Sequence, residues 1–153
     1  MRNSKGFTLI ELMVVIIVIG ILVMITMANY IALQNRAKLA QVRETMHTVQ
    51  LATETFSTKN NGAYPANAAS ITADGGVTLA GILPGARMPT NPFTQAATTL
   101  DWTNVLGTPP ATDPAGGVSL NVTQSVAGGN YDQYDIVAEN DIGVPLAQVL
   151  KNY

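Results

Sequence analysis

The sequence predicts an α+β protein in which one long N-terminal helix packs on a small antiparallel β-sheet head. Three patterns carry this prediction. A long apolar segment near the N-terminus continues into an amphipathic segment without a break. Residues 118–126 alternate apolar and polar side chains, as half-buried strands do. The remainder of the 153-residue chain is rich in Ala, Thr, Gly, Asn and Pro, which suits short strands joined by turns.

The apolar segment is long enough to cross a membrane. Residues 12–35 contain no charged side chain. At about 1.5 Å per residue they span about 36 Å, more than a bilayer core of about 30 Å. Arg2 and Lys5 precede the segment, which favours a cytoplasmic N-terminus. We therefore expect residues 7–33 to form a membrane-spanning half of the helix. Glu11 is the exception, because a lone carboxylate is costly in hydrocarbon and implies a partner.

Residues 34–58 are expected to form an amphipathic second half of the same helix. Apolar or small side chains recur at spacings of four and three, which marks one helix face. This stripe consists of Val42, Met46, Val49, Thr53 and Phe56. The Lys59-to-Gly62 segment ends the pattern, so we expect one helix from about residue 7 to about residue 58. Its stripe can pack on a sheet.

Residues 59–153 are expected to form the globular head. The clearest strand covers 118–126, and the turn at 128–130 leads into a returning strand that contains Tyr134, Ile136 and Ala138. Weaker strand candidates cover 77–79 and 100–105. Apolar residues in the 145–150 segment are expected to hold the C-terminus against the head.

Residues 5–15 read Lys-Gly-Phe-Thr-Leu-Ile-Glu-Leu-Met-Val-Val. This string resembles the N-terminal signal motif of type IV pilins and type II secretion pseudopilins, and the Gly-Ala-Tyr-Pro turn at 62–65 is also similar to that family. The resemblance implies a pilin fold. It implies that residues 1–6 are a leader, that prepilin peptidase cleaves between Gly6 and Phe7, and that the new amine of Phe7 is methylated. Glu11 matches the family glutamate that neutralises this amine on a neighbouring subunit, which would set the filament register.

The resemblance also implies a function and partners. The expected function is that of a major type IV pilin, a structural subunit that polymerises into a surface filament. The expected partners are further copies of the chain, the peptidase, and an inner-membrane assembly platform with its ATPase. Two alternatives stay open: a major pseudopilin of a periplasmic secretion filament, and a membrane-anchored minor or tip subunit that acts as a binding module. Before assembly the chain would cross the inner membrane once.

Two small residues bear on the stiffness of the helix. Gly20 weakens a helix by about 1 kcal/mol relative to alanine, so it is the expected weak point. Alternatively, it is a small residue that lets helices pack closely. Many family members carry a proline eight residues after this glycine, where this chain has Ala28. We therefore expect a more continuous helix here.

The sequence offers little for catalysis or nucleic-acid binding. It contains no cysteine and a single histidine, His47, on the polar face of the helix. No phosphate-binding loop or paired metal motif is visible, so we predict no enzyme and no catalytic residue. The formal net charge is −2, which does not favour binding to nucleic acid.

Calcium is the one cofactor that the sequence raises. Asp132, Asp135, Glu139 and Asp141 cluster near the C-terminus, and major pseudopilins bind calcium in their C-terminal loops. However, the spacing of these residues matches no calcium loop, and side chains that alternate on a strand do not converge. The favoured interpretation is a solvated acidic edge and no cofactor.

Overall fold

The structure is a computed structural model that describes residues 6–98, 100–103, 105–111, 115–127, 129–146 and 149–152. It divides into two compact units, residues 1–37 and residues 38–153, which are treated separately below. In chain order the elements are α1 (Leu9–Lys59), α2 (Leu79–Ile82), the 3-10 helix η1 (Pro84–Ala86), β1 (Leu100–Thr103), β2 (Val118–Thr123), β3 (Gln133–Ala138) and β4 (Leu150–Lys151).

The long helix is present and uninterrupted in secondary structure. It begins at Leu9, two residues later than predicted, and ends at Lys59. The backbone is helical at both Gly20 and Ala28, as expected for a chain without the family proline. A Cβ added at Gly20 would meet nothing within 4 Å, so no contact within the described residues requires glycine there. The helix ends where Asn61 and Gly62 turn to positive φ and the Gly62 N–H bonds to the Ser57 carbonyl at 2.9 Å.

The N-terminal unit has no core of its own among its described residues. Its large apolar side chains, from Phe7 to Leu33, are all exposed in the isolated chain. α1 contains a stretch that is long and apolar enough to cross a membrane. Surface of this kind must be covered by lipid or by other protein.

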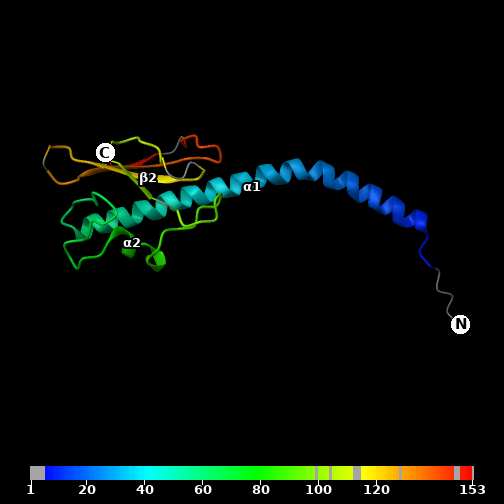
Figure 1. Ribbon diagram of the computed structural model, residues 1–153, viewed down its shortest axis with the longest axis horizontal. Coiled ribbons are helices and arrows are strands. Elements are labelled where there is room, and N and C mark those ends of the chain that lie inside the picture. The colour runs from blue at the N-terminus through cyan, green and yellow to red at the C-terminus, as the bar shows by residue number, and fades with distance from the viewer. Residues whose placement is uncertain are drawn as a thin grey trace. The chain divides into compact units, whose positions relative to one another are not determined.

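The core lies in the unit of residues 38–153. The sheet lies along one side of α1 and the short helix α2 lies on the other (Figure 1). All five residues of the predicted stripe on α1 are buried. They pack against the apolar face of the sheet, which consists of Val118, Leu120, Val122, Tyr134, Ile136 and Ala138. The spacing of the stripe therefore predicted this packing correctly.

The sheet is mixed, with strand order β1-β2-β3-β4. β2 pairs antiparallel with β3, and β3 pairs antiparallel with β4, so the α+β class and the tethered C-terminus are confirmed. The prediction of an antiparallel sheet is wrong for one pair, because β1 runs parallel to β2. The connection between β1 and β2 is long enough to carry the chain back to the starting edge, as a parallel pair requires.

Other local predictions need correction. Residues 77–79 do not form a strand: the Thr78 hydroxyl accepts a hydrogen bond from the Gly81 N–H at 3.3 Å and caps α2. β2 ends at Thr123 rather than 126, because the Ser125 N–H donates to the Asp132 carboxylate at 2.7 Å instead of continuing the ladder. Gly128 of the predicted turn lies outside the described residues.

The second face of the sheet is polar and nevertheless buried. Ser119, Asn121 and Asp135 are fully covered by the segment that follows β1. The Thr108 carbonyl accepts from Ser119 Oγ at 2.6 Å and from Asn121 Nδ2 at 2.9 Å. The Asp135 carboxylate accepts from Asn121 Nδ2 at 2.7 Å and from the Gly107 N–H at 2.6 Å. These bonds compensate the cost of burying the carboxylate and hold the segment on the sheet.

Candidate assembly site at the start of the long helix

The first turn of α1 is a capping box formed by Thr8 and Glu11. The Thr8 N–H and hydroxyl donate to Glu11 Oε2 at 2.8 and 2.7 Å. In return, the Glu11 N–H donates to Thr8 Oγ1 at 3.4 Å. This reciprocal arrangement satisfies two backbone donors that would otherwise be orphaned at the helix end, and it fixes the start of the helix at Leu9.

The same bonds orient the Glu11 carboxylate. Both Thr8 donors use Oε2, and among the described residues none donates to Oε1. Phe7, Ile10, Glu11, Val14 and Val15 line an open groove of about 370 Å³. The groove is apolar apart from the carboxylate. Oε1 of Glu11 is therefore available to a cationic donor that approaches along an otherwise apolar surface.

The predicted cleavage site lies just outside the helix. Gly6 and Phe7 precede the capping box and are exposed, outside regular secondary structure. Residues 1–5 of the predicted leader lie outside the described residues. A protease needs accessible, non-helical backbone, and the Gly6–Phe7 bond meets that condition here.

Thr8 is a functional candidate that the sequence reasoning missed. The Thr-x-x-Glu spacing at positions 8–11, directly before an apolar run, is a known signature of a helix start. That signal was available and places the beginning of the helix at residue 9 rather than 7.

The four calcium candidates do not form one site. Asp132 accepts hydrogen bonds from the Ser125 hydroxyl and N–H, which lower the pKa of its carboxyl. Asp135 is engaged by Asn121 and Gly107, as described above. Asp141 is exposed on the loop after β3. Within the described ranges, no group of three or more His, Cys, Asp and Glu side chains is placed to hold a metal ion.

Glu139 is the unusual member of that set. It is only 5% exposed, and its Oε2 has no hydrogen-bond partner among the described residues. Burial, followed by the nearby negative charge of Asp101, raises the pKa of the Glu139 carboxyl above its ordinary value. The backbone of Glu139 lies beside the start of β2, where its N–H donates to the Gly117 carbonyl at 3.1 Å.

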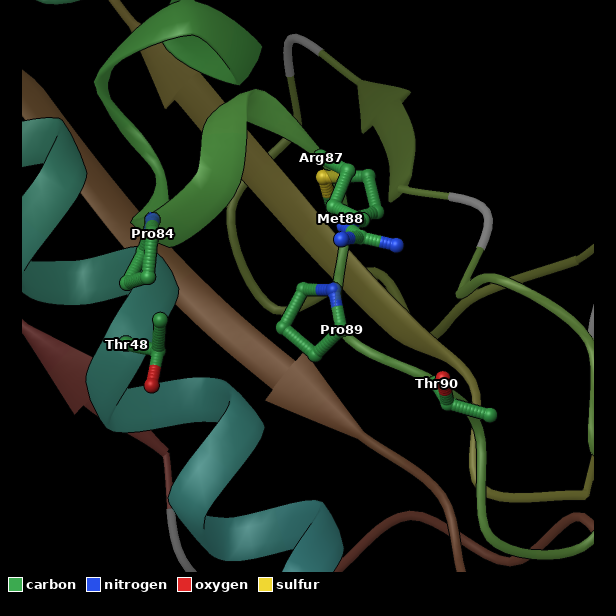
Figure 2. Close-up of a pocket in the computed structure, with 6 residues that line it drawn as sticks. All are labelled: Thr48, Pro84, Arg87, Met88, Pro89 and Thr90. Carbon is green, nitrogen blue, oxygen red and sulfur yellow. The ribbon is translucent and has the colours of Figure 1, made fainter.

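The pocket of the head beside Thr48 lacks the residues of an acid–base site. One pocket of about 360 Å³ lies where Thr48 of α1 faces the 84–90 segment (Figure 2). Arg87 is the one charged residue among those that line it, and no carboxylate or histidine does. His47 is exposed on α1.

Known proteins are similar to this chain, and the matching family model covers its N-terminal site. The family model for the prokaryotic N-terminal methylation motif matches residues 1–27. Over 71 residues, 46% of this chain, the sequence is 38% identical to the type IV wide pilus major component PilA4 of Thermus thermophilus, of which 53% is covered. Over 54 residues, 35% of this chain, it is 39% identical to the type IV major pilin protein PilA of Myxococcus xanthus, of which 24% is covered.

A third relative extends the pattern. The type IV narrow pilus major component PilA5 of Thermus thermophilus is 46% identical over 50 residues, 33% of this chain and 43% of the relative. The chain thus spans about half, or less, of the length of these curated relatives. No solved structure matches the chain. The predicted resemblance is confirmed: the chain carries the N-terminal methylation motif and is similar to major type IV pilins.

Proposed function

We propose that this chain is the precursor of a major type IV pilin, a structural subunit that polymerises into a surface filament. The observation that carries the proposal is the N-terminal site: a methylation motif, an exposed non-helical Gly6–Phe7 bond, and Glu11 on an exposed apolar helix. The similarity to major pilins of two bacteria supports the pilin, and no relative named above favours the secretion pseudopilin or the tip module.

The capping box suggests how Glu11 works before and after assembly. In the membrane, Thr8 satisfies Oε2, so the carboxylate is never without partners. Cleavage after Gly6 would free the amine of Phe7, which is a cation at neutral pH whether or not it is methylated. An amine from a neighbouring subunit can then reach Oε1 along the apolar groove. A charge pair in such surroundings is strong when both groups keep their hydrogen bonds.

The apolar half of α1 supplies the rest of the proposed interface. Its side chains exchange lipid for other copies of the same helix on assembly, so close packing and the ion pair must favour the filament. Gly20 would then act either as the flexible point of the helix or as a close-packing position, and the open space around it fits both roles.

The proposal includes partners and location. Prepilin peptidase would remove residues 1–6 and methylate Phe7, and an inner-membrane platform with its ATPase would extract the subunit. The protein would act as a filament component rather than an enzyme, without a cofactor and without direct binding of nucleic acid. An acidic chain with carboxylates already engaged by protein donors supports the last two points.

Substitution of Glu11 tests the proposal. Glu11→Ala removes the charge and half of the capping box, whereas Glu11→Gln removes the charge and can retain a hydrogen bond from Thr8. We expect both variants to be cleaved after Gly6, and both to lose most of the sheared filament. Gly6→Glu serves as the opposite control, because it should block cleavage and leave the precursor in the membrane. Normal filament yield from Glu11→Gln would disprove the role of the charge.

A further inference from the structure

An apolar pocket lies beside the open edge of the sheet. It has a volume of about 290 Å³, and its walls include Leu79, Met88, Leu100 and Trp102. None of the residues that line it is charged. β1, which supplies Leu100 and Trp102, forms the edge of the sheet among the described strands. For comparison, an apolar cavity of roughly 150 Å³ holds a benzene molecule. The pocket is therefore large enough for one or two aliphatic side chains.

The same head presents an apolar side chain that its own fold does not cover. Ile142 is 76% exposed on the loop after β3. Hydrogen bonds hold the loop in this conformation: Asn140 Oδ1 accepts from the N–H groups of Ile142 and Val144 at 3.0 and 2.9 Å. The Asn140 N–H also donates to the Val144 carbonyl at 2.9 Å. A side chain held on such a loop loses little conformational entropy on docking.

We infer that the loop of Ile142 in one copy docks into the Trp102 pocket of a neighbouring copy. This inference rests on the proposed filament. The two surfaces are different patches of one head, and the segment of α2 and the C-terminal loop lie on opposite sides of α1 (Figure 1). A contact between unlike patches is heterologous, and such contacts generate open, growing assemblies unless they close into a ring.

Charge complementarity supports the choice of occupant. Asp141 directly precedes Ile142, and Arg87 directly precedes Met88 of the pocket wall; both charged residues are exposed. Arg87 also lines the adjacent pocket shown in Figure 2. In the docked pair, Asp141 would lie beside the pocket wall that contains Met88, the residue that follows Arg87. A rim pair of this kind contributes orientation more than affinity.

The chain contains no cysteine, so introduced cysteines report on a single contact. Ala80 lines the pocket and is exposed, so Ala80→Cys and Ile142→Cys can be combined without disturbing a buried residue. A disulfide needs Cα atoms about 4.4–6.8 Å apart, which makes the test stringent. The matched control combines Ala80→Cys with Val126→Cys, since Val126 is similarly exposed at 70% on a different turn.

Under mild oxidation, filaments of the Ala80→Cys/Ile142→Cys chain should give a ladder of disulfide-linked multimers, and the Val126→Cys control should not. Subunits dispersed in detergent should give no ladder. Filaments without a ladder, or an equal ladder from the control, would overturn the inference. Failure of the unsubstituted chain to form filaments would instead contradict the proposed function.

The unsubstituted chain supplies a second readout. Trp102 is its single tryptophan, so its emission reports on the pocket alone. We expect emission at shorter wavelength in filaments than in detergent-dispersed subunits, because docking removes water from the indole. The shift should be lost in filaments that carry Ile142→Asp, and the same wavelength in both states of the unsubstituted chain would again overturn the inference.

Discussion

A hydrogen bond between Tyr134 and Glu54 joins the sheet to α1, and the loss of stability on removing it can be estimated. The hydroxyl of Tyr134 on β3 donates to Glu54 Oε1 of α1 at 2.6 Å. Tyr64 donates to the other oxygen of the same carboxylate at 3.2 Å, and the two rings pack edge to face with centroids 4.7 Å apart. Burial and the bond to Glu54 raise the pKa of Tyr134, so its hydroxyl stays a donor at all ordinary pH values.

Tyr134→Phe removes this donor and leaves the ring in place. A hydrogen bond to a charged group contributes about 1.5–3 kcal/mol, and the remaining bond from Tyr64 limits the damage to Glu54. We therefore expect a loss of about 2 kcal/mol, which corresponds to roughly 10 °C in Tm for a domain of this size. Tyr64→Phe should cost less, under about 1 kcal/mol, because its bond is longer and less buried.

The assay is thermal unfolding of the purified subunit in detergent, followed by Trp102 emission. Tyr131→Phe is the matched control, because Tyr131 is a half-buried tyrosine whose contact with Tyr64 is made by its backbone carbonyl, at 2.8 Å. If Tyr134→Phe lowers Tm no more than Tyr131→Phe does, the hydrogen bond from Tyr134 to Glu54 does not stabilise the packing of the sheet on the helix.

Three further predictions concern the head. Because the pKa of Glu139 is raised in the folded state, its contribution to stability is fully present below the unfolded pKa of about 4.3 and is lost as the pH rises through the folded pKa. Glu139→Gln should therefore stabilise the head by about 1 kcal/mol at pH 7 and have little effect at pH 4, as measured by urea unfolding with Asp141→Asn as control. Gly116→Ala should destabilise the head by more than about 2 kcal/mol, because φ at Gly116 is +72° and the new Cβ would lie 2.6 Å from the Phe93 ring. The control is Gly107→Ala, because φ is +79° there but nothing lies within 4 Å of the new Cβ. This control should cost only the backbone strain of about 1–2 kcal/mol. Addition of a chelator should leave Tm unchanged, and a fall in Tm that calcium restores would contradict the assignment of the acidic residues.

Periodic patterns predicted the elements that bury one apolar face. The spacing of Val42, Met46, Val49 and Phe56 predicted the side of α1 that meets the sheet, and the alternation from Val118 predicted β2. Both predictions depend only on the side-chain period of one helix or one strand. The motif at residues 5–15 was likewise readable, because its side chains are adjacent in sequence.

Contacts between distant segments were not predictable in the same way. Alternation indicated that Ser119, Asn121 and Asp135 face solvent, but the segment after β1 covers them and supplies backbone partners such as the Thr108 carbonyl. The parallel pairing of β1 depends on the same segment. No local signal encodes where an irregular connection lies, so the buried polar face and the direction of β1 required the structure.

In the proposed filament, Glu11 of one subunit pairs with the amine of Phe7 on its neighbour. An atomic-resolution cryo-electron microscopy map of sheared filaments tests it most directly. We expect a chain that begins at Phe7, with its amine within about 4 Å of Glu11 Oε1 of the adjacent subunit, while Thr8 still donates to Oε2. A filament in which Glu11 contacts only its own Thr8, with the neighbouring amine elsewhere, would contradict it.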